Sequence, residues 1–530
     1  MSKNIKNIKK HNILILDFGS QYSQLLTRRV REIGIYCELW PWNTHEKKII
    51  QFKPMGIILS GGPESTTKLN SPKAPEYVFS AGIPVLGICY GMQIMTKQLG
   101  GKVKTSSKRE FGYTEIKIIK KSPLIQKINK YKKKNTNILN VWMSHEDKII
   151  TIPKNFTTIA KTKTCPFAII SNEKKKFYGI QFHPEVTHTQ QGQHILKQFI
   201  IKICKCKSLW KPKNIIKNII QNIQKKTKNN NDNVILGFSC GIDSLITALL
   251  LHKAIGNRLF CIFLDNGLLQ FYKYKKRIKY FEKQYNLKIL YFSVKNRFFQ
   301  VLSGITDPEI KRKIIGKTFI EIFNEKALHY VPNAKWLAQG TIYSDMIESA
   351  KTTTNSTQLI KSHHNVGGIP KKMKMHLIEP LKKLFKDEVR NIGKKLKIPY
   401  NLLYQHPFPG PGLGIRILGE VKQEYCNILR KTDKIFLDEL KKSKIYHKIS
   451  QAFTVFLPIR SVGIMGDTRK YEWTIALRAI ESTDFMTAKW VNLPYKLLIN
   501  ISNRIINEIK GISRVVYDIS NKPPSTIEWE

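Results

Sequence analysis

The sequence predicts an α/β fold with two doubly wound, mainly parallel-sheet domains followed by a smaller α+β domain. Short apolar runs such as ILILDF, GIILSGG and PVLGICYG alternate with amphipathic segments over residues 12–205. The same alternation resumes over residues 234–405, after a stretch rich in Lys and Asn, and its character changes beyond HPFPGPGLGIR. Such alternation is typical of strands and helices packed in layers. We therefore predict domains at 11–206, 207–405 and 406–530.

The composition allows several hydrophobic cores, since 42% of the 530 residues are hydrophobic. The formal net charge of +52 would suit nucleic acid. However, the excess is mostly Lys and occurs together with Ile and Asn, as in KNIIKNIIQNIQKKTKNNNDN. These three residues share A/T-rich codons. We therefore interpret the charge as compositional drift and expect no specific nucleic-acid partner.

The cysteines and the apolar runs favour a cytoplasmic protein without a membrane partner. The eight cysteines are scattered and form no CxxC pair, which is typical of a reducing compartment. No run of about 18 apolar residues is present, so we expect no spanning helix. The first apolar run is short and meets Asp17, which indicates a core strand rather than a signal peptide.

Two separate motifs predict a nucleophilic cysteine site. PVLGICYGMQ places Cys89 between Gly87 and Gly91 directly after an apolar strand, which is the pattern of a nucleophile elbow. The start of the following helix would lower a thiol pKa. GIQFHPEV places His183 and Glu185 two residues apart, so that both side chains face the same way in an extended segment. His183 could accept the thiol proton, and Glu185 could orient its ring.

A third motif, ILSGGPES, supplies candidate oxyanion donors. The amide of Gly62, together with that of Tyr90, could bind a developing oxyanion. For the cysteine motif alone, a buried cysteine at the end of a strand is the alternative. Together the three motifs resemble the class I glutamine amidotransferase family, which implies glutamine hydrolysis through a thioester at Cys89. Glu146, in VWMSHEDKI, stands where that family usually has Gly, and we expect a turn there near the glutamine pocket.

A second chemical site is predicted at NVILGFSCGIDSLITALL, which indicates a strand, a polar turn and a helix. The turn lacks the GK[ST] ending of a Walker loop. Its backbone amides and the helix start suit an anion. Asp243 would repel phosphate unless Mg²⁺ lay between them, so it favours a metal–nucleotide complex. The alternative is a helix cap made by Ser and Asp.

This turn resembles the SGGxDS loop of the ATP pyrophosphatases, which implies cleavage of ATP between its α- and β-phosphates. Cys240 and Leu245 depart from the closest pattern of that loop. Related loops tolerate bulkier residues, so we expect a right-handed or extended backbone at Cys240, and we expect Leu245 to face helix packing. The ATP-binding residues implied by the resemblance are Ser239, Cys240, Gly241, Ile242, Asp243, Ser244, Leu245, Asp265, Gln339 and Gly340.

The segment IKSHHNVGGIPKKM is polar, contains glycine and is flanked by Lys, which predicts a mobile lid over the nucleotide. The adjacent histidines suggest zinc, but they point opposite ways in an extended chain, so we expect no metal there. Ser344 stands where the family usually has Pro. The predicted lid residues are Lys361, His363, His364 and Asn365.

Over residues 13–530 the chain resembles the glutamine-hydrolysing GMP synthase family. The resemblance implies a ligase that adenylates xanthosine 5′-monophosphate (XMP) with ATP and Mg²⁺ and then aminates it, without a tightly bound organic cofactor. It also implies a homodimer formed by the last domain, whose tail contacts XMP. The XMP-binding residues implied are Arg312, Lys522, Ile527 and Glu528. For the apolar tail residues, dimer packing is the alternative.

Two other functions remain open from the sequence. The first is an ATP-dependent tRNA-thiolating or other amidating enzyme with the same loop, in which Cys240 would be a second reactive cysteine. That interpretation leaves the glutamine-hydrolysing motifs unexplained. The second is a non-catalytic regulatory scaffold. The intact set of Cys89, His183, Glu185, Asp243 and Ser244 favours an enzyme.

Overall fold

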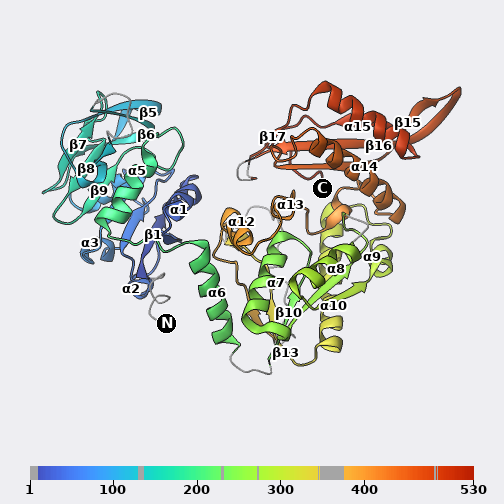
Figure 1. The fold of residues 1–530 in the computed structure, drawn as a ribbon. Coiled ribbons are helices and arrows are strands. Elements are labelled where there is room, and N and C mark those ends of the chain that lie inside the picture. The colour runs from blue at the N-terminus through green and yellow to red at the C-terminus, as the bar shows by residue number, and fades with distance from the viewer. Residues whose placement is uncertain are drawn as a thin grey trace. The chain divides into compact units, whose positions relative to one another are not determined.

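The computed structural model describes most of the chain and divides it into two compact units, residues 1–217 and 218–530 (Figure 1). The described residues are 10–128, 137–227, 232–270, 274–343, 345–346, 375–482, 485 and 487–530. The predicted lid residues Lys361, His363, His364 and Asn365, and also Ser344, lie outside them. In the part of the chain that is described, no helix has both the length and the apolar character needed to span a membrane.

The first unit is built on a nine-stranded sheet with the order β2-β1-β3-β4-β9-β8-β7-β5-β6. Strands β2, β1, β3, β4 and β9 pair in parallel, and the remaining pairs are antiparallel. The strands are β1 (Asn12–Asp17), β2 (Tyr36–Pro41), β3 (Gly56–Leu59), β4 (Val85–Ile88), β5 (Lys102–Ile118), β6 (Ile138–Thr151), β7 (Thr157–Lys161), β8 (Ile169–Asn172) and β9 (Phe177–Ile180). The helices are α1 (Ser23–Glu32), α2 (Glu46–Phe52), α3 (Tyr77–Ser80), α4 (Tyr90–Gln98), α5 (Gly192–Lys197) and α6 (Pro212–Lys226), which continues into the second unit.

The central strands of this sheet are apolar on both faces, as expected where helices cover both sides. Along β1, Ile13 and Ile15 belong to one hydrophobic cluster, while Leu14 and Leu16 belong to another. This alternation follows from the two-residue period of a strand. The carboxyl ends of β3, β4 and β9 thereby come to one edge of a rigid sheet.

The second unit contains a five-stranded parallel sheet with the order β12-β11-β10-β13-β14. The strands are β10 (Asn233–Gly237), β11 (Leu259–Asp265), β12 (Ile289–Ser293), β13 (Ala334–Ala338) and β14 (His376–Ile378). The helices around it are α7 (Ile242–Ile255), α8 (Tyr274–Tyr285), α9 (Lys295–Leu302), α10 (Pro308–Tyr330), α12 (Lys386–Lys395) and α13 (Tyr400–Leu403).

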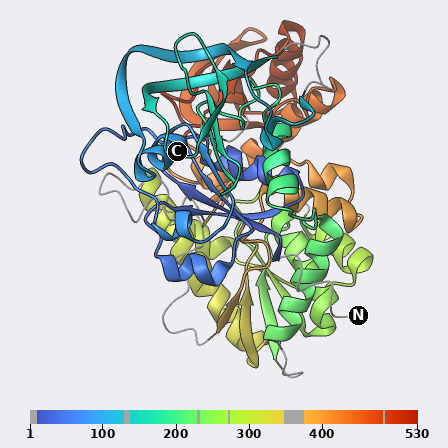
Figure 2. The ribbon, with the colours of Figure 1, turned by 90° about the vertical axis from the view of Figure 1, so that its left-hand side faces the viewer.

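This sheet is doubly wound, with helices on both of its faces (Figure 2). Ile235 and Ile262 share a cluster with Phe298 of α9 and Ile322 of α10, whereas Phe263 contacts Tyr274 of α8 on the other face. The strand order changes direction at β10, because β11 lies on one side of it and β13 on the other. Ligands of open α/β sheets bind at the carboxyl ends of the strands at such a switch point.

A four-stranded sheet completes the second unit. Strands β15 (Gln451–Met465) and β16 (Thr468–Glu481) form a long antiparallel pair, to which β17 (Lys489–Trp490) and β18 (Ile512–Tyr517) add. Helices α14 (Gln423–Lys442) and α15 (Tyr495–Glu508) pack against this sheet. This α+β arrangement, together with one fully parallel sheet and one sheet whose strands β2, β1, β3, β4 and β9 are parallel, confirms the predicted fold class. The boundaries at 206/207 and 405/406 stay predictions.

Candidate active sites

Cys89 lies in a sharp turn between β4 and α4, as predicted for a nucleophile elbow. Its backbone has φ +50° and ψ −109°, and the residue is 6% exposed. Such a backbone costs a non-glycine residue about 1–3 kcal/mol and is typical of functional sites. Gly91 makes the turn possible, because a Cβ there would lie 2.3 Å from the carbonyl oxygen of Leu59. The elbow therefore holds the thiol at the carboxyl edge of the sheet.

His183 and Glu185 follow β9 and lie beside this thiol. The Nδ1 atom of His183 is 2.7 Å from Oε1 of Glu185, and both side chains are buried. Burial lowers the pKa of His183, but hydrogen bonds to Cys89 and Glu185 and the negative charge of these groups raise it to about 11. The arrangement favours an imidazolium beside the sulfur, which is the state that supports a reactive thiolate.

The candidate oxyanion donors lie next to the same ring. A Cβ on Gly61 would be 3.0 Å from Cε1 of His183, so the loop after β3 lies directly against the imidazole. The Gly91 amide donates to the Ser60 carbonyl at 3.0 Å and ties this loop to the elbow. The amide of Tyr90 is the first of α4, where amides lack an intrahelical partner. Gly62 and Tyr90 thus lie on segments that meet at Cys89.

The turn expected around Glu146 is wrong, because this residue lies within strand β6. Pairing with β5 makes side chains alternate, so Glu146 points outward and forms a 3.3 Å ion pair with Arg109. The strand nevertheless runs beside the nucleophile, since Sγ of Cys89 lies 3.5 Å from the carbonyl oxygen of Ser144.

One neighbour of the thiol was missed from the sequence. The amide Nε2 of Gln181 lies 3.7 Å from Sγ of Cys89. Gln181 stands two residues before His183, so the same two-residue period that predicts His183 and Glu185 on one face could have identified it.

The loop between β10 and α7 is held by its own hydroxyl groups. The hydroxyl oxygens of Ser239 and Ser244 are 3.0 Å apart. The Gly241 amide donates to Ser239 Oγ at 3.3 Å, and the Ser244 hydroxyl donates to the Gly241 carbonyl at 3.0 Å. Hydrogen bonds within the protein thus hold the shape of the loop, and Ile242 and Asp243 start α7.

Asp243 does not cap its own helix. Its Oδ2 accepts a 2.6 Å ion-paired hydrogen bond from Nζ of Lys386, at the start of α12. Its Oδ1 is buried and has no hydrogen-bond partner among the described residues. A buried carboxylate oxygen without a partner is costly unless a ligand satisfies it. The sequence analysis missed Lys386, because its long separation from the loop left no local signal.

The expectation of a right-handed or extended backbone at Cys240 is wrong. Cys240 has φ +60°, which is the left-handed region, and is 2% exposed. Burial raises the pKa of its thiol to about 12. The chain must reverse from strand to helix within a few residues, and a left-handed residue achieves this. The buried, protonated thiol does not suit a second reactive cysteine. Leu245 is buried on α7, as expected.

The other predicted ATP residues lie at the same sheet edge. A Cβ on Gly340 would be 3.2 Å from backbone atoms of Asp243 and Ser244, so the segment after β13 packs on the loop. The preceding residue, Gln339, is held by its amide, which donates to the Ile378 carbonyl at 3.0 Å.

Asp265 ends β11 on the other side of β10. It accepts hydrogen bonds from the Tyr291 hydroxyl at 2.7 Å and from the Gly267 amide at 3.2 Å. Nζ of Lys295, the first residue of α9, lies 3.2 Å from the same carboxylate. Asp265, Tyr291 and Lys295 line a cavity of about 310 Å³.

Helix α14 contacts the chain just beyond Asp265. Arg430 donates to the carbonyls of Leu269, at 2.7 Å, and Gly267. Gln270 donates to the buried carboxylate of Asp433 at 2.6 Å. These contacts fix the segment that follows β11.

Three of the four predicted XMP residues lie around the end of the chain. Glu528 forms a two-bonded ion pair with Arg416, at 3.0 and 2.9 Å. Ile527 packs against the cluster formed by Phe453, Val455, Leu457 and Ala476. Arg312 donates to the backbone carbonyl of Glu530. The side chain of the fourth, Lys522, instead donates to the Phe485 carbonyl at 2.8 Å.

The fold and the cysteine site define a class I glutamine amidotransferase in the first unit. The profile of the family described as "Glutamine amidotransferase class-I" matches residues 14–203, and that described as "GMP synthase C terminal domain" matches residues 438–529. The chain belongs to the glutamine-hydrolysing GMP synthase family. Curated members from Serratia proteamaculans and Yersinia enterocolitica are each 59% identical to it over 526 residues, covering 99% of this chain and 100% of theirs.

A solved structure from Thermoplasma acidophilum, described as one component of a GMP synthase, is also similar to the chain. It is 30% identical, covers 37% of this chain and 94% of its own, and has a TM-score of 0.33. The curated relatives, at 59% identity over 526 residues, confirm the predicted resemblance at the level of the family. The tRNA-thiolating enzyme and the non-catalytic scaffold are not favoured.

Proposed function

We propose that this chain makes GMP from XMP, ATP and glutamine, with one catalytic site in each unit. It is a ligase that forms a C–N bond. The observation that carries the proposal is that one chain of this family holds both an intact Cys89–His183–Glu185 arrangement and a loop before Asp243 that its own hydrogen bonds hold.

In the first site, Cys89 attacks the side-chain amide of glutamine and His183 transfers protons. The thiol adds to the amide carbon, and the oxygen of the tetrahedral intermediate accepts from the amides of Gly62 and Tyr90. His183 then protonates the departing nitrogen, so ammonia leaves and a thioester remains at Cys89. Water hydrolyses the thioester to glutamate. The buried Glu185 carboxylate, 2.7 Å from His183, stabilises the imidazolium throughout.

In the second site, the loop after β10 binds the phosphates of ATP. The 2-oxo oxygen of XMP attacks the α-phosphorus, pyrophosphate leaves, and ammonia then displaces AMP from the purine carbon. The first amides of α7 bind the departing pyrophosphate, and the hydroxyls of Ser239 and Ser244 turn from their bonds within the loop to donate to it. Lys386, which pairs with Asp243, adds a positive charge beside the start of α7. Because hydrogen bonds within the loop hold the start of α7, its amides need little rearrangement as the charge develops.

The residues of this site fit a Mg²⁺ ion that arrives with ATP. The buried Oδ1 atom of Asp243, which has no partner among the described residues, is the oxygen that would hold it. Mg²⁺ commonly takes one or two carboxylates and completes its coordination with phosphates and water. When bound, it neutralises charge on the departing pyrophosphate. The described residues contain no group of three His, Cys, Asp or Glu side chains that could hold a metal by itself.

XMP binding, dimerisation and location form the last part of the proposal. Arg312, Lys522, Ile527 and Glu528 bind XMP, with Arg312 on its phosphate. Strands β15 and β16 form a long pair (Figure 1), and exposed apolar side chains on this pair support a homodimer formed through its sheet. These side chains are Ile459, Val462, Ile464 and Tyr471. The scattered free cysteines support a cytoplasmic location.

A product assay tests this function. The full chain is incubated with XMP, ATP, Mg²⁺ and glutamine, and GMP, AMP, pyrophosphate and glutamate are measured together. We expect equimolar formation of all four. Glutamate without GMP, or consumption of ATP that does not depend on XMP, would contradict the proposal. A parallel incubation with tRNA and a sulfur donor should give no thiolated product.

A further inference from the structure

The last thirteen residues of the chain, 518–530, are held by three cationic side chains that are almost completely buried. Arg478, Arg416 and Lys311 are 0%, 1% and 0% exposed and are among the largest fully buried side chains of the described protein. Burying an unpaired cation is strongly unfavourable. Each of the three is paired with the segment 518–530, which we call the tail.

The contacts follow the order of the tail. Arg478 forms a 3.1 Å ion pair with Asp518 and donates to the carbonyls of Ser520, at 2.5 Å, and Thr526, at 3.0 Å. Arg416 binds the Glu528 carboxylate with two hydrogen bonds. The tail is therefore fixed on both sides of Ile527.

Lys311 makes the last of these contacts. Its ammonium group donates to the carbonyls of Ile417, at 2.8 Å, and Gly414, at 3.4 Å, and pairs with the Glu530 carboxylate. All three ammonium hydrogens are therefore used. The other carboxylate oxygen of Glu530 accepts from the Gly419 amide at 3.3 Å.

The local geometry shows that the contact between Lys311 and Glu530 determines the register of the tail. Glu528 and Glu530 are two residues apart and both point inward, whereas Trp529 between them is 37% exposed and its indole donates to Asp518 at 2.9 Å. A shift of one residue would reverse this alternation. Since Lys311 belongs to α10 and Arg416 to the segment before α14, the two ion pairs fix the tail's register relative to both elements.

We propose that Lys311 is a positioning residue for the XMP site. It acts through Glu530 to set the register of the tail, so that Ile527 and Glu528 are presented to the nucleotide together with Arg312, the next residue of α10, which donates to the Glu530 carbonyl. This inference rests on the proposed function, in which Arg312, Ile527 and Glu528 bind XMP. Lys311 itself is enclosed by protein groups and need not touch the nucleotide.

A double-mutant cycle tests the inference in the full chain, with ammonium as nitrogen donor. Lys311→Met and Glu530→Gln should each raise the KM for XMP about tenfold or more, because each leaves a buried charge unpaired. The double variant should add less than about twofold to the larger single effect, since the two residues act together. The KM for ATP should change little in all three.

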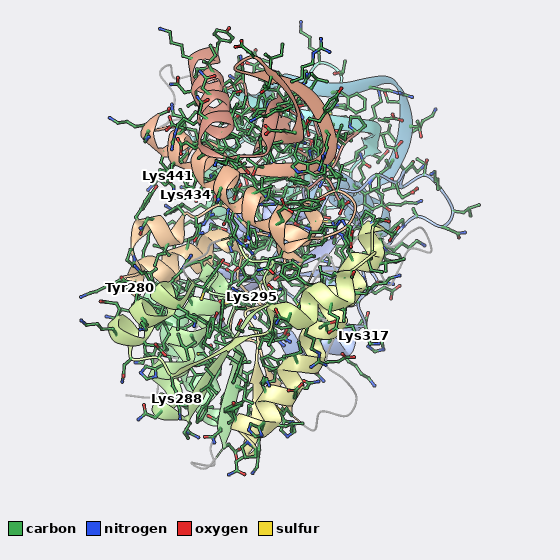
Figure 3. The ribbon with its side chains drawn as sticks, turned by 90° about the vertical axis from the view of Figure 1, so that its right-hand side faces the viewer. Tyr280, Lys288, Lys295, Lys317, Lys434 and Lys441 are labelled. Carbon is green, nitrogen blue, oxygen red and sulfur yellow. The ribbon has the colours of Figure 1, made fainter. Side chains whose placement is uncertain are left out.

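A matched control removes a Lys that lies exposed on the same helix. Lys317→Met takes one positive charge from α10 (Figure 3) and should leave every constant unchanged. A Lys311→Met variant that melts at a lower temperature but keeps its KM for XMP would overturn the inference, because the role would then be structural only. Additive effects of the two substitutions would also overturn it. If Lys311→Met does not fold, an unchanged KM in Glu530→Gln decides against it.

Two further variants separate this inference from the proposed function. Arg312→Met and Glu528→Gln test the XMP site itself. If neither raises the KM for XMP, the proposed XMP site is wrong, and the inference fails with it. If both raise the KM while Lys311→Met does not, only the inference is wrong.

Discussion

Replacing Cys240 with Gly and with Ala tests the loop conformation directly. Cys240 has φ +60°, where a residue with a Cβ is disfavoured by about 1–2 kcal/mol. Both replacements lose the packing of the buried thiol. The difference in stability between the two variants therefore reports the effect of the backbone conformation at this position. Gly relieves the left-handed strain but adds about 0.5–1 kcal/mol of chain entropy in the unfolded state relative to Ala. We therefore expect the Gly variant to be more stable than the Ala variant by about 0.5–1 kcal/mol.

Hydrogen exchange of peptides that cover β10 and α7 is the appropriate assay, because a chain with several domains has no single unfolding free energy. The expected difference makes exchange about two- to fivefold slower in the Gly variant than in the Ala variant. If the backbone were right-handed or extended, the order would reverse, and that result would refute the reasoning.

Activity supplies a second measurement on the same variant. The strain belongs to a loop whose shape is held by Ser239 and Ser244 within the protein. We therefore expect kcat/KM for ATP to change by less than about threefold in the Gly variant, because the strain alters folding rather than binding. A tenfold gain would show that Cys240 impairs the phosphate site.

Four further predictions address the sites and the charge. Cys89→Ala should abolish GMP synthesis from glutamine while ammonium at high pH still supports it; equal loss with both donors would contradict separate sites. Asp243→Asn should reduce synthesis from either donor by about a hundredfold or more, as expected for a group that organises transition-state charge, and retention of most activity would indicate a structural role. Hydrogen bonds and negative charge outweigh burial and raise the pKa of His183 from 6.5 to about 11, so its charge stabilises the fold fully below pH 6.5 and progressively less up to pH 11. The stability difference between wild type and His183→Asn, measured by hydrogen exchange of peptides that cover β9 and α4 and corrected for the intrinsic pH dependence of exchange, should therefore shrink as pH rises. A widening difference would contradict the assignment. Exposed lysines such as Lys288 and Lys434 on the face shown in Figure 3 should bind nucleic acid without sequence preference, with affinity falling steeply between about 50 and 200 mM salt, whereas a tight RNA complex at physiological salt would contradict compositional drift.

Much of both sites could be predicted from the sequence, because their residues lie in short local motifs. Cys89 and the loop at Ser239–Ser244 each follow an apolar strand, and parallel strands bring such residues to one edge. His183 and Glu185 followed from the two-residue period of an extended segment.

The features that were missed depend on long-range contacts or on backbone angles. Lys386 reaches Asp243 across 143 residues, and Lys311 reaches Glu530 across 219, so no local pattern relates them. The left-handed Cys240 could not be predicted, because residue type alone does not determine φ at a cysteine. Glu146 was placed in a turn because a family glycine suggested one, whereas pairing with β5 keeps the segment extended.

The central claim is that one chain transfers the glutamine amide nitrogen to XMP, and an isotope experiment measures this most directly. The full chain is supplied with XMP, ATP, Mg²⁺ and glutamine labelled with ¹⁵N in its amide, together with unlabelled ammonium at low concentration and neutral pH. We predict GMP that carries ¹⁵N in its exocyclic amino group, and loss of that label in the Cys89→Ala variant, whose remaining GMP is unlabelled. Unlabelled GMP from the wild-type chain, or no GMP at all, would contradict the account.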